Sequence, residues 1–257
     1  MNHKSKNRLP YFLFFLLFAV ATTACRSFVE RKNYFHPRFE CFAEPGYRNS
    51  KDFNHYIEKI WQPLRLVYQA ENQKIGKSKI VFVGNSLVIL FFPNLLQKEF
   101  PGESIANRGI GGDMSETLLA RLDEDVLSLA PEKLVIEIGG NDFIQGKCLS
   151  LVQNNLKAIV QKVHSKNPNI EIYLLSVPPT RVRELNQIVP VYNLFLSQVA
   201  RETKNVEYIE TWDLFRKENE PSLKDEFLRE NGDPLHFNDK GYEVWGKRLR
   251  PYLQNPK

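Results

Sequence analysis

The sequence predicts a three-layer α/β/α fold, in which one parallel β-sheet is covered by helices on both faces. Short apolar runs rich in Val, Ile and Leu recur from residue 78 onward, as expected for strands that are buried on both faces. Segments with apolar residues at helical spacing lie between these runs. Strands and helices that alternate along a chain favour parallel pairing of the strands. The ligand site of such a sheet lies at the carboxyl ends of its strands.

The first expected strand is the run 79–83, which ends at Gly84 and is followed by a helical stretch over 87–100. A weaker strand over 105–108 precedes a helix over 114–129, in which leucines and valines fall at helical spacing. The remaining strands are expected at 134–138, 170–175 and 206–209, and the remaining helices at 149–164, 189–203 and 240–253.

Composition divides the 257 residues into three parts. Residues 1–24 are expected to be a signal peptide, and residues 78–257 are expected to form the α/β domain. Residues 25–77 are charged and aromatic, without an alternation of strands and helices, and are predicted to be a tether plus a segment packed on that domain. A short helix interrupted near Pro63 is expected within 53–70.

The first 24 residues have the pattern of a bacterial export signal. Three basic side chains precede an apolar stretch over 11–21, which is too short to span a bilayer core of about 30 Å as a helix. Small residues then lead to Cys25, which resembles the lipid-modified cysteine of a bacterial lipoprotein. We therefore expect an exported protein anchored to a membrane by a lipid on Cys25. Arg26 is not an acidic retention signal, which favours the outer membrane. An ordinary secretory signal followed by a chance cysteine would instead give a periplasmic or secreted protein.

The charge balance argues against a nucleic-acid-binding protein. The formal net charge is +5, but the signal peptide holds three basic residues and no acidic ones, so the rest carries 32 basic and 30 acidic side chains. The sequence has no concentrated basic stripe. Its five histidines are scattered, without the Cys and His spacing of a metal site, and no metal is expected. Cys41 and Cys148 either form a disulfide or remain as two free buried thiols.

Three of the expected strands end in turns that carry unusual residues. Ser86 follows the first strand, where its backbone N–H begins a helix and can stabilise an oxyanion, although a serine there is also a common helix N-cap. Residues 107–113 follow the second strand and include Gly112, which allows close approach of a ligand, and Asp113, which can cap the next helix. Asn141 follows the third strand, where its amide can donate into the same cleft or simply build the turn.

Near the C-terminus, Asp233 lies three residues before His236. The carboxylate can hold the imidazole in one tautomer and stabilise its cation, which leaves the other ring nitrogen free to take a proton from Ser86. A serine, a histidine and an aspartate that meet at one sheet edge predict acyl transfer through a covalent intermediate.

Taken in order, these blocks resemble the SGNH (GDSL) hydrolase family. They are Gly84-Asn85-Ser86, Gly112-Asp113, Gly140-Asn141-Asp142 and Asp233-x-x-His236. The resemblance covers about residues 79–252. The stretch 107–113 is similar to the branch that contains the brain-type platelet-activating factor acetylhydrolase catalytic subunits and related bacterial acyl esterases.

The resemblance implies a flavodoxin-like sheet of about five parallel strands, no cofactor or metal, and a set of roles. Ser86 would be the nucleophile, His236 the general acid and base, and Asp233 its orienting partner. The oxyanion donors would be the backbone N–H groups of Ser86 and Gly112 and the side-chain amide of Asn141.

The expected reaction is hydrolysis of small acyl esters, acetyl esters above all, on glycans or lipid-like molecules. Asn85 stands where the family commonly has Asp, in a position that supports the nucleophile turn without reacting, so it would weaken the activity rather than abolish it. A lysophospholipase or thioesterase with the same residues is one alternative, and a non-catalytic lipoprotein that binds sugar or lipid is another. The apolar run 87–92 could line a deeper acyl groove, whereas the domain has no long apolar insertion to serve as a lid.

Overall fold

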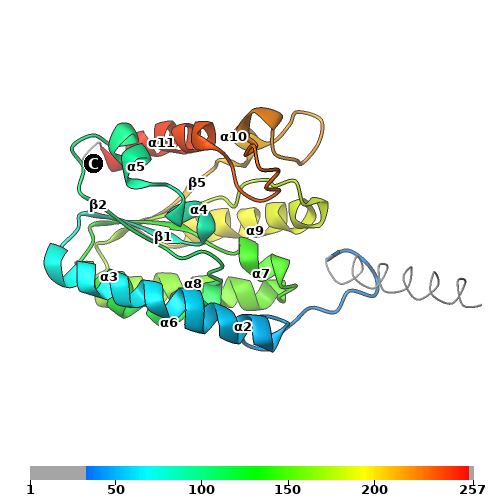
Figure 1. The fold of residues 1–257 in the computed structure, drawn as a ribbon, viewed down its shortest axis with the longest axis horizontal. Coiled ribbons are helices and arrows are strands. Elements are labelled where there is room, and N and C mark those ends of the chain that lie inside the picture. The colour runs from blue at the N-terminus through cyan, green and yellow to red at the C-terminus, as the bar shows by residue number, and fades with distance from the viewer. Residues whose placement is uncertain (1–32, 255–257) are drawn as a thin grey trace, which may run out of the picture.

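A computed structural model describes residues 33–254, which fold around one five-stranded sheet (Figure 1). All neighbouring strands pair in parallel, in the order β2-β1-β3-β4-β5. The strands are β1 (Ile80–Gly84), β2 (Ile105–Gly109), β3 (Lys133–Glu137), β4 (Glu171–Leu175) and β5 (Val206–Ile209). The predicted three-layer α/β/α fold with five parallel strands is confirmed.

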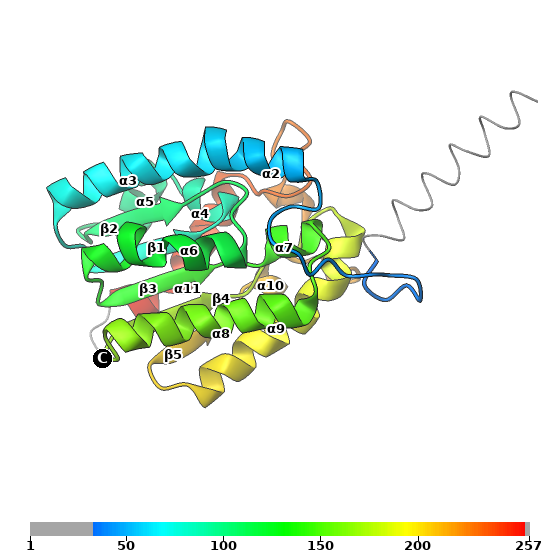
Figure 2. The same ribbon diagram turned by 90° about the horizontal axis from the view of Figure 1, so that it is seen from below.

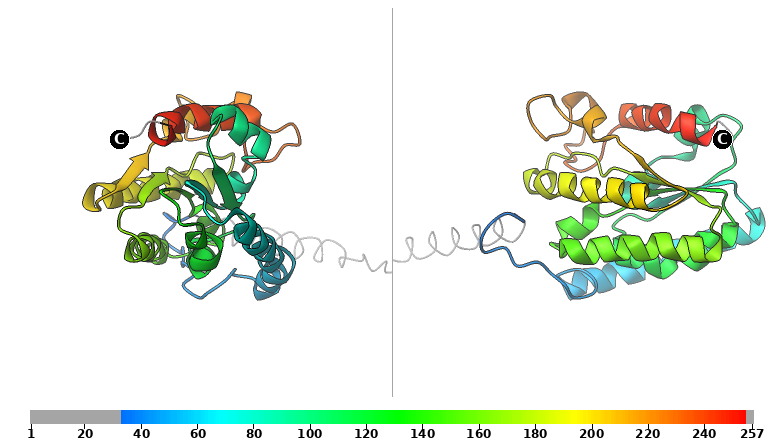
Figure 3. Two further views of the ribbon diagram at one scale, coloured as in Figure 1. Left: turned by 90° about the vertical axis from the view of Figure 1, so that its left-hand side faces the viewer. Right: turned by 180° about the vertical axis from the view of Figure 1, so that it is seen from behind.

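Helices cover both faces of this sheet and create two cores (Figures 1 and 3). On one face lie α6 (Ser115–Asp125), α8 (Leu149–Lys166) and α9 (Arg183–Glu202). On the other face lie α5 (Pro93–Glu99), α10 (Trp212–Phe215) and α11 (Asp239–Leu253). Alternate residues of β1 enter different cores, because successive side chains of a strand point to opposite faces. Both faces are therefore buried, as the continuous apolar runs predict.

Parallel pairing brings the carboxyl ends of three strands level with one another. Gly84 at the end of β1 lies opposite Gly109 of β2 and Glu137 of β3. The turns that follow these strands contain α4 (Ser86–Ile89), the loop 110–114 and α7 (Gly140–Ile144). They meet at the edge where an α/β sheet holds its ligand.

Two helices differ in their bounds from the predicted ones. The helix predicted over 87–100 is two helices, because α4 ends at Ile89 and α5 begins at Pro93, a residue that is well tolerated in the first turn of a helix. The helix expected from residue 189 begins six residues earlier, at Arg183, and continues through Pro190. Its first residues include the charged Arg183 and Glu184, so the sequence resembles a connection there. Short 3₁₀ helices lie at Leu127–Leu129 and Asp225–Phe227.

The N-terminal segment forms one helical run instead of the interrupted short helix expected from the sequence. The run consists of α2 (Ser50–Tyr56), a π-helical turn (Ile57–Trp61) and α3 (Gln62–Ile75), which lie in line in Figure 2. Pro63 falls in the first turn of α3, and the wider π turn before it leaves room for the proline ring. The run packs along α6, so the segment lies on the α/β domain.

A disulfide fixes the start of this segment. Cys41 is bonded to Cys148, which decides between the two alternatives that the sequence left. The predicted signal peptide and Cys25 lie outside the described residues. Within residues 33–254, no helix has the length and apolar character needed to cross a membrane.

Candidate active site

Ser86 stands at the sharp turn between β1 and α4. A Cβ on Gly84 would lie 1.9 Å from the carbonyl oxygen of Glu137, so only glycine fits before the turn. Asn85 is the N-cap of α4, and its Oδ1 accepts a hydrogen bond from the N–H of Leu87 at 2.8 Å. The alternative in which Ser86 serves as the N-cap is therefore wrong. Ser86 is the first helical residue, where a helix leaves the backbone N–H without an internal partner.

The loop before α11 brings Asp233 and His236 to Ser86. His236 Nε2 lies 2.7 Å from Ser86 Oγ, and His236 Nδ1 lies 2.6 Å from Asp233 Oδ2. The other carboxylate oxygen accepts hydrogen bonds from the N–H groups of Leu235 and His236. Burial alone would raise the pKa of Asp233, but these hydrogen bonds and the imidazole outweigh it and hold the pKa below its ordinary value of 3.8. Asp233 is therefore ionised at neutral pH and can stabilise an imidazolium.

Gly112 and Asn141 lie in the two neighbouring turns. Gly112 has a left-handed φ of +85°, and a Cβ there would lie 2.8 Å from the Tyr47 hydroxyl, so both the backbone and the space require glycine. Asn141 Nδ2 donates a hydrogen bond to the carbonyl oxygen of Asp113 at 2.9 Å. Because a primary amide has two N–H donors, this bond leaves one for an oxyanion. The structure thus brings all five predicted site residues to one edge of the sheet.

Two buried polar networks that the sequence did not reveal hold these turns in place. Asp113 does not cap α6 but forms an ion pair with Arg121, with Nη2 and Oδ2 2.7 Å apart and both side chains fully buried. Thr117 also donates its hydroxyl hydrogen to Asp113. In the next turn, Asp142 accepts hydrogen bonds from the backbone N–H and the hydroxyl of Ser115.

Glu137 is a buried carboxyl beside the nucleophile turn. Neither of its oxygens has a hydrogen-bond partner of normal geometry among the described residues. Burial raises the pKa of Glu137 to about 8, an effect that the nearby Asn85 side chain partly offsets. An Asp at position 85 would place a second carboxyl against Glu137. Asn85 therefore avoids a pair of like charges in the interior.

We expect the replacement Glu137→Gln to stabilise the protein at high pH. The pKa of Glu137 is raised from 4.5 in the unfolded chain to about 8 in the folded one, so its contribution to stability is complete below pH 4.5 and is lost as the pH rises to 8. Glutamine does not titrate. The melting temperature of the variant should exceed that of the wild type at pH 9 but not at pH 5. Glu132→Gln, at an exposed position just before β3, is the control, and equal shifts at both pH values would contradict the assignment.

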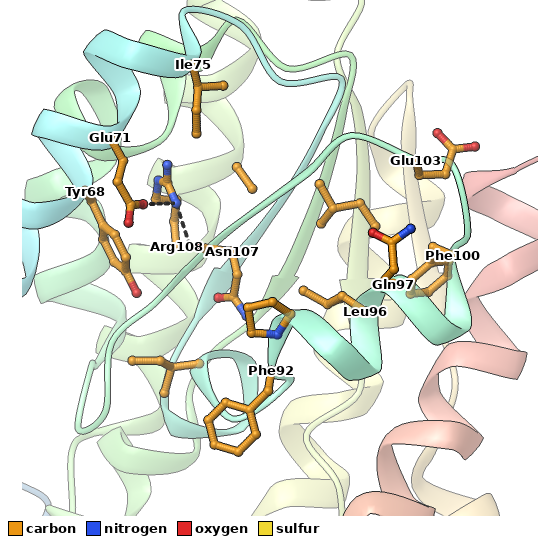
Figure 4. Close-up of a pocket in the computed structure, with 14 residues that line it drawn as sticks. Tyr68, Glu71, Ile75, Phe92, Leu96, Gln97, Phe100, Glu103, Asn107 and Arg108 are labelled. Carbon is orange, nitrogen blue, oxygen red and sulfur yellow. Dashed lines mark hydrogen bonds and ion pairs between the residues drawn. The ribbon is translucent and has the colours of Figure 1, made fainter.

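The described residues also form a cleft of about 560 Å³ along the edge strand β2 (Figure 4). Its walls come from α3, α5 and β2 and include Phe92 and Leu96. Figure 4 shows the Arg108 guanidinium beside the Glu71 carboxylate, with a separation of 3.2 Å. No member of the Ser–His–Asp set lines this cleft, so it is distinct from the site of the predicted chemistry. Within the described part of the chain, no group of His, Cys, Asp and Glu side chains is suited to hold a metal.

Known proteins resemble this chain in both sequence and fold. The model of the GDSL-like lipase/acylhydrolase family matches residues 87–244. Platelet-activating factor acetylhydrolase IB subunit alpha1 of Pongo abelii is 32% identical over 136 residues, which cover 50% of this chain and 58% of that protein. Esterase TesA of Pseudomonas aeruginosa is 34% identical over 89 residues, which cover 33% of this chain and 44% of that protein. The chain thus spans about half the length of these relatives.

A solved structure extends the likeness over most of the domain. A protein from Streptococcus pneumonia, described as a platelet activating factor, superposes with a TM-score of 0.71 and 29% identity. The alignment covers 79% of this chain and 97% of the other. The family match begins at residue 87, and therefore leaves out the whole N-terminal helical run.

Proposed function

We propose, from the premise that this chain belongs to the GDSL-like lipase/acylhydrolase family and is a serine ester hydrolase, that it hydrolyses small acyl esters, acetyl esters above all, on glycans or lipid-like molecules. The observation that carries the proposal is the continuous contact from Ser86 Oγ through His236 to the Asp233 carboxylate, with separations of 2.7 and 2.6 Å. A protein that only bound its ligand would need no such series of contacts between a serine, a histidine and an aspartate.

In the proposed reaction, Ser86 Oγ attacks the carbonyl carbon of the ester while His236 Nε2 takes the hydroxyl proton. The carbonyl oxygen becomes an oxyanion, which the N–H groups of Ser86, Gly112 and Asn141 stabilise. His236 then gives the proton to the leaving alcohol, and the bond between the carbonyl carbon and the alcohol oxygen breaks. His236 next takes a proton from a water molecule, whose oxygen attacks the acyl carbon. The bond between that carbon and Ser86 Oγ then breaks, His236 returns the proton to Oγ, and the acid leaves.

The preference for short acyl chains rests on the apolar run that follows the nucleophile. Leu87, Val88 and Phe91 are buried in the core, so these side chains do not line an open groove. Phe92 is half exposed, but it lies at the cleft beside β2 and not at the Ser–His–Asp set. A long chain would therefore stay in water and forgo about 0.8 kcal/mol for each methylene left unburied. The relative named as an acetylhydrolase supports the same choice.

The acyl preference is tested by kcat/KM of the full chain on nitrophenyl acetate, butyrate, octanoate and palmitate. We expect the highest value for acetate or butyrate and a fall at octanoate. A steady rise through octanoate would replace this proposal with a lysophospholipase or thioesterase that uses the same residues. An organophosphate should modify Ser86, which peptide mass spectrometry detects.

We also propose that a lipid on Cys25 anchors the protein to a bacterial membrane, with the outer membrane favoured. The support is the basic and apolar pattern of residues 1–24 and the small residues before the cysteine. Replacing Cys25 by serine should abolish palmitate labelling and release the protein from membranes. Unchanged membrane association would argue for another mode of attachment.

A further inference from the structure

The N-terminal segment from Asn33 to Ile75, which lies outside the family match, contacts both turns that carry the proposed oxyanion donors. One set of contacts reaches the loop that contains Gly112. The other reaches the turn that follows Asn141. These contacts suggest a role for the segment in catalysis.

Three tyrosines of this segment donate hydrogen bonds to the glycine-rich loop. The Tyr47 hydroxyl donates to the carbonyl oxygen of Gly112 at 3.0 Å. The Tyr56 hydroxyl donates to Asp113 Oδ1 at 3.2 Å, and the Tyr68 hydroxyl donates to the carbonyl oxygen of Gly109 at 2.5 Å. The rings of Tyr47 and Tyr56 stack with their centroids 5.1 Å apart, so they support each other.

The start of the same segment is fastened to the turn that follows Asn141. The disulfide joins Cys41 to Cys148, at the end of that turn. Next to it, the N–H of Phe42 donates to the carbonyl oxygen of Gly146 at 2.7 Å, and the N–H of Cys148 donates to the carbonyl oxygen of Phe42 at 3.2 Å. These bonds add a short stretch of parallel pairing to the covalent link. The segment therefore connects the two oxyanion loops from outside the sheet.

The glycine loop needs such support because glycine alone does not fix its own backbone. Gly111 and Gly112 are adjacent, and each has access to both signs of φ. The Tyr47 hydroxyl and the Tyr56 ring occupy the space in which a side chain at Gly112 would otherwise restrict the backbone. An oxyanion donor is effective only when its N–H is already aimed at the developing charge.

We propose that Tyr47 is a positioning residue, which holds the Gly112 backbone in place for oxyanion binding, and that the disulfide-linked segment 41–68 is the brace that carries it. This inference rests on the proposed function, because it assigns Tyr47 a role in the same ester hydrolysis. Tyr47 acts through Gly112 and does not itself take part in bond making.

Replacing Tyr47 by phenylalanine in the full chain should lower kcat about tenfold, less than the 10²–10³-fold loss of a direct oxyanion donor, with KM changed less than twofold. The rate of Ser86 modification by a nitrophenyl phosphonate should fall by the same factor, because that reaction also builds negative charge on oxygen. Tyr173→Phe is the control. It too removes a phenol hydroxyl, but one that donates to the Glu171 carboxylate beside the Tyr252 carbonyl oxygen, and it should leave kcat unchanged.

Wild-type values of kcat and of the phosphonylation rate in Tyr47→Phe would overturn the proposed brace. A variant in which only KM rises would also overturn it, because Tyr47 would then be a binding residue. A wild type that neither hydrolyses esters nor reacts at Ser86 would instead overturn the proposed function. The double replacement Cys41→Ser and Cys148→Ser tests the link separately. It should lower kcat without changing KM, and unchanged kcat would exclude the disulfide from the brace.

Discussion

Replacing Ser86 by alanine should reduce ester hydrolysis by about 10⁴- to 10⁶-fold, the loss expected when the nucleophile of a Ser–His–Asp set is removed. The fold should not suffer, because the side-chain oxygen contacts His236 and the helix is capped by Asn85 instead. The measurements are kcat/KM on nitrophenyl acetate and the melting temperature of the full chain.

Three companion variants make this result specific. His236→Ala should cost about as much as Ser86→Ala, and the double variant should be no worse than either, because members of one catalytic set act as a unit. Ser165→Ala is the control, since it removes a serine hydroxyl that donates to the Gln161 carbonyl oxygen on the exposed side of α8. Wild-type rates in Ser86→Ala, or trapping of a different serine, would refute the assignment.

The largest expected loss of stability comes from replacing Arg121 by methionine. The Arg121 side chain is fully buried and bonds to the Asp113 carboxylate and to the carbonyl oxygens of Gly84 and Arg108. Methionine fills much of the space but leaves a buried carboxylate and two strand-end carbonyls without their donor. Removing one partner of a buried ion pair costs about 3–5 kcal/mol. We expect a decrease of that size in the free energy of unfolding, measured with urea.

Lys162→Met provides the matched control. The ion pair between Lys162 and Asp123 has an equally short separation of 2.7 Å but lies on the surface, where such pairs contribute about 0–1 kcal/mol. If Arg121→Met lost no more stability than Lys162→Met, the buried network would not be what holds the oxyanion loop.

The fold and the site residues could be predicted because their signals are local. A strand buried on both faces is a continuous apolar run, and the turns after three such runs expose Ser86, Gly112 and Asn141 within a few residues of strand ends. Asp233 and His236 are only three residues apart in the sequence. Helix ends were less predictable, since α9 begins at Arg183, within a charged stretch that resembles a connection.

The supports of the site could not be predicted because they join residues far apart in the chain. Tyr47 and Gly112 are 65 residues apart, and no periodic pattern relates an aromatic segment to a glycine loop. Glu137 is the one charged residue in the predicted strand 134–138, where nothing in the sequence distinguishes a buried carboxyl from one at an exposed strand end. Pairing of Cys41 with Cys148 likewise depends on a fold that brings them together.

The disulfide also makes part of the protein a closed covalent ring. Its two cysteines are 107 residues apart, and Ser86, Gly112 and Asn141 lie within the ring, whereas Asp233 and His236 lie on the chain that leaves it. One cut by a protease within the ring would leave both fragments attached, and they would separate only in the presence of a reductant. Reduction would also remove the constraint that the closed loop places on the unfolded chain. The free energy of unfolding would fall by up to about 5 kcal/mol as a result. The protein should therefore tolerate nicking in an oxidising compartment and lose that tolerance in a reducing one.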